Sequence, residues 1–162
     1  MAEVKLSHDP APVLKPALRI AGLGDNFKPA TIGNIPRLWD RLASLLPLPG
    51  QQGRESYGVA RSGLDGRDMH YLAGVAVSAD ALLPADFQTL ELSARPYLVF
   101  RQELDGSALH PQMRAAAQVI WGRLVPASGR QLTHAPELEV YPEGFRPDLA
   151  GAWVEWWIPV EL

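Results

Sequence analysis

The chain has 162 residues, of which 47% are apolar and 20% charged, a composition typical of a globular protein with one sizeable core. The absence of cysteine excludes disulfides, thiolate metal sites and a thiol nucleophile. The net charge of −3 and the scattered arginines argue against direct nucleic-acid binding, which needs a basic surface.

The beginning of the chain lacks the long apolar core of a signal peptide. No apolar run approaches the roughly 20 residues that a membrane-spanning helix needs. We therefore expect a cytoplasmic protein that does not enter a membrane.

The first half of the chain begins with signals for an arm, a strand and a helix. Residues 1–12 are polar and interrupted by prolines, which predicts a loose N-terminal arm. Residues 13–23 predict a strand whose end is marked by Gly22 and Gly24. Apolar residues then recur at helical spacing over residues 35–46, which predicts an amphipathic helix.

A hairpin follows this helix. Residues 56–61 and 69–78 predict two strands, joined by a turn at Gly63 and Asp65-Gly66. Both faces of the second strand are apolar or small, which is typical of a central strand that is covered on both sides.

The second half of the chain carries the same kinds of signal. Residues 95–102 predict a strand, and a helix follows with apolar positions from Leu109 onward until Pro126 ends it. Residues 135–145 and 152–160 predict two further strands.

The order strand, helix, strand, strand therefore occurs twice, over about residues 13–80 and 93–162. This repetition predicts an α+β fold in which the two units form one curved antiparallel sheet with two helices on one face. We expect residues 13–162 to be a single domain, with a small-molecule site in a cleft between its halves.

The predicted strand within residues 135–145 carries an acid beside an aromatic ring. Alternation places Leu138 and Val140 on one face and Glu139 and Tyr141 on the other. Such a face can bind a cationic or polar-aromatic compound, and it can equally be a solvated edge. We expect the nearby Glu137 and Glu143 to be solvated charges at the rim of the site.

The last predicted strand carries a second acid between tryptophans. Alternation places Trp153, Glu155 and Trp157 on one face and Trp156 on the other. If Glu155 faced the same cavity as Glu139, one of the two carboxylates would have a raised pKa and could support general acid/base catalysis. Four histidines show no spacing typical of a zinc site, so we expect neither a metal nor a cofactor.

Several segments, in this order along the chain, resemble the GyrI-like domain, which is also called the bacterial transcription-activator effector-binding domain. They are the helix Ile35-Pro-Arg-Leu-Trp-Asp-Arg-Leu42, the hairpin pieces 57–59 and 71–75, the strand 95–100, the helix end 121–129 and the closing strands 138–141 and 156–160.

The resemblance implies a duplicated fold with a central pocket, which in multidrug-sensing relatives binds bulky, often cationic aromatic compounds. By this resemblance Glu139 matches the acidic pocket residue, and Trp39, Tyr71 and Trp156 are candidate aromatic walls. Tyr141 and Glu155 join this set of ligand-binding candidates from the strand patterns.

Relatives that regulate transcription carry a DNA-binding region before this domain, whereas only residues 1–12 precede the first expected strand here. The resemblance therefore implies a stand-alone, bacterial ligand-binding form, with a possible homodimer. Two alternatives stay open. One is a hydrolase of strained cyclopropane-bearing or other electrophilic compounds that uses Glu139, Glu155 and Tyr71; the other is a module that binds DNA gyrase or a separate regulator.

Overall fold

The computed structural model describes residues 4–62 and 68–162. The expected turn at Gly63 and Asp65-Gly66 lies outside the described residues. Among the helices of the described residues, none is long and apolar enough to span a membrane.

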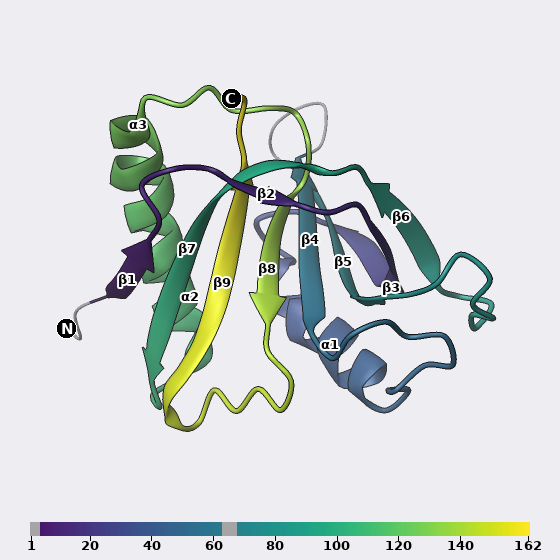
Figure 1. Cartoon of the computed structure of the whole chain (residues 1–162). Helices are drawn as coiled ribbons and strands as arrows, with labels where there is room; N and C mark the ends of the chain where they lie inside the picture. The colour runs from purple at the N-terminus through teal and green to yellow at the C-terminus, as the bar shows by residue number, and fades with distance from the viewer. Residues whose placement is uncertain (1–3, 63–67) are drawn as a thin grey trace.

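The described residues form one antiparallel sheet with helices on one side (Figure 1). The strands, in chain order, are β1 (Lys5–His8), β2 (Val13–Lys15), β3 (Leu18–Phe27), β4 (Ser56–Ser62), β5 (Met69–Ala76), β6 (Gln88–Leu92), β7 (Arg95–Asp105), β8 (Glu137–Tyr141) and β9 (Ala150–Pro159). In space their order is β1-β7-β9-β8-β4-β5-β3-β6, and β2 pairs with β7 outside this path.

The helices follow the predicted order. A short 3₁₀ turn, η1 (Ile32–Asn34), leads into α1 (Ile35–Ala43). The second helix runs through α2 (Leu109–Val119), a π-helical turn η2 (Ile120–Leu124) and α3 (Val125–Ser128). It ends at Gly129, whose φ of 68° is the left-handed conformation that glycine adopts easily.

The duplication explains the strand order. The first unit, β3-α1-β4-β5, contributes the neighbours β4-β5-β3, and the second unit, β7-α2-β8-β9, contributes β7-β9-β8. The two units therefore meet where β8 pairs with β4, in the middle of the sheet. The predicted α+β fold, with one antiparallel sheet and its helices on one face, is confirmed.

The two sheet faces have separate cores. On the helix face, α1 packs with Tyr71 and Ala73 of β5, and α2 packs with Phe100 of β7 and Trp156 of β9. The opposite face buries alternate residues of the same strands, such as Leu72, Leu138 and Trp157. The expectation that β5 is buried on both faces is confirmed, because neighbouring strands flank it and apolar residues cover both faces.

The element boundaries differ from the prediction at several points. The expected strand over residues 13–23 is two strands, because Pro16 interrupts it, and β3 then continues through Gly22 and Gly24 to Phe27. Gly22 does not end the strand; it lies opposite Gly74 of β5, where a side chain would overlap the backbone of that strand. The first helix is shorter than expected and ends at Ala43.

The N-terminal arm also differs from the expected loose segment. Its residues Lys5–His8 form β1, which pairs with β7 at the edge of the sheet. A strand of four largely exposed residues has no clear apolar alternation, so the sequence pattern alone did not indicate it.

Candidate functional site

The candidate site is a chain of hydrogen bonds on the helix face of the sheet that ends at the carboxylate of Glu139. The indole N–H of Trp39 in α1 donates to the hydroxyl of Tyr71 in β5 over 3.1 Å. The Tyr71 hydroxyl donates to Oε1 of Glu139 over 2.8 Å, and the Tyr141 hydroxyl donates to the same oxygen over 2.7 Å. Four of the six predicted residues therefore meet in one network, which joins α1, β5 and β8.

A glycine between the two strands makes this network possible. Gly58 of β4 lies opposite Ala73 of β5 on one side and opposite Glu139 of β8 on the other. A Cβ at this position would overlap the Tyr71 hydroxyl and lie 2.8 Å from Oε1 of Glu139. The missing side chain therefore leaves the space through which Tyr71 reaches the carboxylate.

Trp156, the fifth predicted residue, lies directly opposite Glu139 where β9 pairs with β8. Its ring is buried, and its indole N–H donates to Oε1 of Gln102 over 3.0 Å. The Gln102 side chain is also buried, and its amide N–H donates to the backbone carbonyl of Gln112 in α2. The Trp156 ring is thus fixed beside Glu139 through a buried polar link to the second helix.

The electrostatic environment keeps the hydroxyls of Tyr71 and Tyr141 protonated, so both can donate hydrogen bonds to Glu139. Burial raises the pKa of Tyr71 and of Tyr141 well above the usual range, and the neighbouring Glu139 adds to this rise. Burial also raises the pKa of Glu139, while the hydrogen bonds from Tyr141 and Tyr71 and the nearby His110 act against that rise. Since a buried carboxylate is costly without a partner, the two hydroxyl donors stabilise its ionised form.

One oxygen of Glu139 remains available. Both tyrosines donate to Oε1, whereas within residues 4–62 and 68–162 no donor is bound to Oε2 and no Lys or Arg forms an ion pair with the carboxylate. Oε2 is also absent from the enclosed, unpaired polar atoms of the described residues, so it keeps contact with solvent. This oxygen can therefore accept a hydrogen bond or an ion pair from a ligand.

Glu155, the sixth predicted residue, does not join the site. Because Trp156 faces Glu139, Glu155 points to the opposite face of the sheet, where its carboxylate pairs with Arg101 over 3.1 Å and accepts the indole N–H of Trp157. The structure therefore does not bring Glu139 and Glu155 together as a pair of carboxylates in one cavity.

The acid that does share the face of Glu139 is Glu137, which was expected to be a charge at the rim of the site. Burial, and secondarily repulsion by Glu139, raises the pKa of Glu137 to about 7, while the side chain of Trp121 acts against the rise. Its Oε2 is enclosed and, among the described residues, has no hydrogen-bond partner. Alternation along β8 already placed residues 137, 139 and 141 on one face, so the pattern contained this signal.

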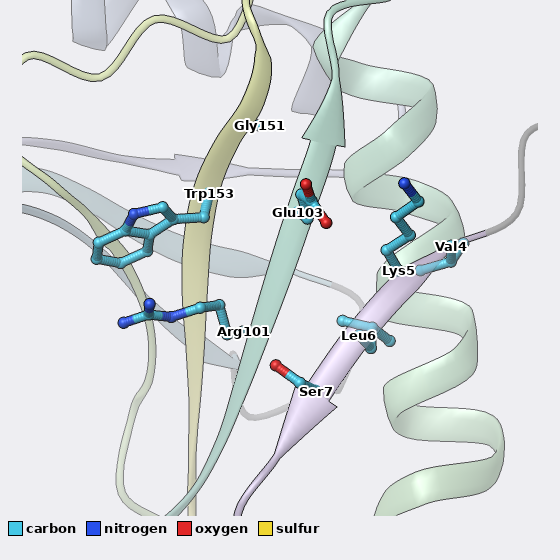
Figure 2. A pocket seen from close by; sticks show the side chains of 8 residues that line it. All are labelled: Val4, Lys5, Leu6, Ser7, Arg101, Glu103, Gly151 and Trp153. Carbon is cyan, nitrogen blue, oxygen red and sulfur yellow. The ribbon is translucent and has the colours of Figure 1, made fainter.

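The described residues contain no group of three or more His, Asp or Glu side chains arranged to hold a metal ion. A shallow depression of about 570 Å³ lies elsewhere, at the edge formed by β1, β7 and β9. Figure 2 shows Arg101 and Trp153 there, and the guanidinium lies 3.9 Å from the centre of the Trp153 ring. None of the residues that line this depression belongs to the Glu139 network.

Several solved structures share this fold. SAV2435 bound to tetraphenylphosphonium aligns with a TM-score of 0.69 and 19% identity, over 99% of this chain and 94% of that one. A protein of Staphylococcus aureus MU50 described as a bacterial transcription regulation protein aligns with a TM-score of 0.71 and 18% identity, over 99% of each chain. The C-terminal domain of EcmrR aligns with a TM-score of 0.63 and 15% identity, over 98% of each chain.

No curated protein matches the sequence. The family model described as the GyrI-like small molecule binding domain, in contrast, matches residues 8–161, which is nearly the whole chain. The resemblance drawn from the sequence is thereby confirmed, and the protein belongs to the GyrI-like small-molecule-binding domain family.

Proposed function

We propose that this domain binds a bulky, cationic aromatic compound at Glu139, in a cleft on the helix face of the sheet. The observation that carries the proposal is the unpartnered Oε2 of a largely enclosed carboxylate, which has no cationic partner among the described residues. The related fold of SAV2435, which is bound to tetraphenylphosphonium, supports the same class of ligand.

The chemistry of the site favours an organic cation over other ligands. An anion would be repelled by the carboxylate, and a small hydrated metal ion would lack the several oxygen ligands that it needs. A quaternary cation sheds its water more easily, and aromatic faces such as that of Trp39 would add about 0.5–2 kcal/mol of attraction.

The two helices lie over different strand pairs. α1 packs over β3 and β5, and α2 packs over β7 and β9, whereas β4 and β8 lie between these strand pairs. On this face β4 presents Gly58, which has no side chain, and the small Ala60. Because the Tyr71 hydroxyl takes the space at Gly58, we propose that the aromatic body of the ligand lies beside Glu139 and over Ala60, with Trp39 and Trp156 as walls.

In the cell, such a domain would sense or sequester a toxic cation in the cytoplasm. The chain also aligns with 57% of the full EcmrR chain, which is known in a complex with DNA. The same proposal covers action through a separate regulator, through DNA gyrase or through a second copy of the chain. The ligand would bind at Glu139 in each case.

The test is the affinity for tetraphenylphosphonium, measured by isothermal titration calorimetry. We expect Glu139→Gln to weaken binding about tenfold or more, because the variant removes the charge and keeps the size of the side chain. Glu143→Gln is the matched control, since Glu143 is exposed and paired with Arg54. Equal affinity in Glu139→Gln and the wild type, with both folded by circular dichroism, would exclude Glu139 as the binding acid.

A further inference from the structure

The second acid on the binding face has no structural role that its contacts explain. Glu137 precedes Glu139 by two positions in β8, so their Cα atoms are about 6.6 Å apart along the strand and their side chains point the same way. Among the described residues Glu137 forms no ion pair, and its Oε2 is enclosed without a hydrogen-bond partner. An enclosed polar atom without a partner costs stability, so its presence in the folded protein calls for an explanation.

An exposed aromatic ring accompanies this acid. Trp121 is 39% exposed, although large aromatic side chains are usually covered, and its side chain interacts with the Glu137 carboxylate. It lies in the π-helical turn η2, a rare geometry that is frequent at functional sites. A partly exposed indole beside an acid is the combination that binds organic cations.

The neighbouring strand carries small residues beside both acids. In β4, Gly58 lies opposite Glu139 and Ala60 lies opposite Glu137. The Tyr71 hydroxyl takes the space at Gly58, whereas Ala60 places only a methyl group beside Glu137. Two carboxylates in a row, with Trp39 near the first and Trp121 near the second, form an elongated site with a negative group for each of two positive centres.

We infer that Glu137 and Trp121 form a second cation subsite next to Glu139, so that the preferred ligands are elongated aromatic dications. This inference rests on the proposed function, because it places the first positive centre at Glu139. The aromatic part of such a ligand lies along β8, and each of its positive ends faces one carboxylate. Glu137 thereby gains in the complex the partner that its enclosed oxygen lacks in the free protein.

The experiment uses two probes that differ in one charge. Methyl viologen has two linked pyridinium rings with a positive nitrogen at each end, and in 1-methyl-4-phenylpyridinium a neutral phenyl ring replaces one of them, which leaves a single positive nitrogen. Both affinities are measured by calorimetry for the wild type, Glu137→Gln, Glu139→Gln and the surface control Glu143→Gln. We expect the affinity of the wild type for the dication to be at least about tenfold higher than for the monocation. Glu137→Gln should remove most of this preference.

The outcomes separate the two proposals. If Glu139→Gln weakens the binding of both probes and Glu137→Gln removes the preference for the dication, both proposals are supported. If Glu139→Gln weakens binding but the preference is the same in the wild type and Glu137→Gln, the second subsite is excluded and the first remains. If Glu139→Gln changes neither affinity, the proposed function itself fails. Trp121→Leu provides a second variant, for which we expect a smaller loss of the same preference, and an unchanged preference would exclude the indole from the subsite.

Discussion

The hydroxyl of Tyr71 hydrogen bonds to the carboxylate of Glu139 across an intervening strand, since β4 lies between β5 and β8. The two residues belong to different halves of the duplicated fold, so this bond joins the halves at the centre of the sheet. It depends on the absence of a side chain at Gly58, which lies between them. The site and the junction of the two units are thus the same structural feature.

Gly58→Ala is therefore expected to damage both stability and binding. The added methyl group would overlap the Tyr71 hydroxyl and displace it from Glu139, which adds overpacking to a lost hydrogen bond. We expect a loss of about 2–4 kcal/mol in the free energy of urea unfolding. Gly122→Ala is the control, because a Cβ there meets nothing within 4 Å; this change should be neutral or stabilising. A Gly58→Ala protein as stable as the wild type would show that the network is not constrained by this glycine.

The two tyrosines are expected to differ in importance. Tyr141→Phe removes one donor from Glu139, whereas Tyr71→Phe removes a donor and also leaves the indole N–H of Trp39 without its acceptor. We expect Tyr141→Phe to cost about 1 kcal/mol of unfolding free energy and Tyr71→Phe about 2 kcal/mol, measured by urea denaturation.

Tyr57→Phe provides the control for these two variants. Its ring is also buried, but its hydroxyl forms no hydrogen bond within the part of the chain that the structure describes. We expect a change within about 0.5 kcal/mol. If Tyr141→Phe costs more than Tyr71→Phe, the link from Trp39 through Tyr71 contributes nothing measurable.

Alternation along single strands correctly predicted which residues share a face, but it could not predict which faces meet. The pattern of β9 separated Glu155 from Trp156, and the pattern of β8 grouped Glu139 with Tyr141. Only the pairing of β8 with β9 decides that Trp156, and not Glu155, shares the face of Glu139. Register depends on contacts between distant segments, so a single strand pattern does not contain it.

The fold was more predictable than the site because its signal is spread over many residues. Helical spacing in two segments and the repeated element order were sufficient for the α+β arrangement. The short edge strand β1 and the break at Pro16 were missed, because both depend on local pairing with β7. Glu137 was misread for another reason: its burial depends on tertiary packing, and Trp121, whose side chain interacts with it, belongs to a different element of the chain.

The raised pKa of Glu137 predicts a specific dependence of stability on pH. This carboxyl group has a pKa of about 7 in the folded protein, against 4.5 for an unperturbed glutamate, so the folded state holds its proton more tightly. Its contribution to stability is therefore fully present below pH 4.5 and is lost as the pH rises through 7.

The comparison of wild type with Glu137→Gln isolates this group from the other titrating residues. We expect the variant to gain stability relative to the wild type by up to about 3 kcal/mol between pH 4.5 and pH 8, with no further gain above pH 8. Urea unfolding at several pH values measures this difference, and Glu143→Gln reports the effect of removing a surface carboxylate. A difference that does not change with pH would mean that Glu137 titrates alike in the folded and unfolded protein.

The buried link between Gln102 and Trp156 should couple the sheet to the second helix. In Gln102→Leu the buried Trp156 indole loses its acceptor, and the Gln112 carbonyl loses the hydrogen bond from Gln102. We expect a loss of about 2–3 kcal/mol in unfolding free energy, together with weaker binding of tetraphenylphosphonium because the ring opposite Glu139 is released.

A double-mutant cycle with Trp156→Phe should give a coupling energy of about 1 kcal/mol or more, since each change removes the same bond. Gln118→Leu, on the exposed side of α2, is the matched control and should change stability by less than about 0.5 kcal/mol. Strictly additive effects of Gln102→Leu and Trp156→Phe would show that the hydrogen bond does not hold the ring in place.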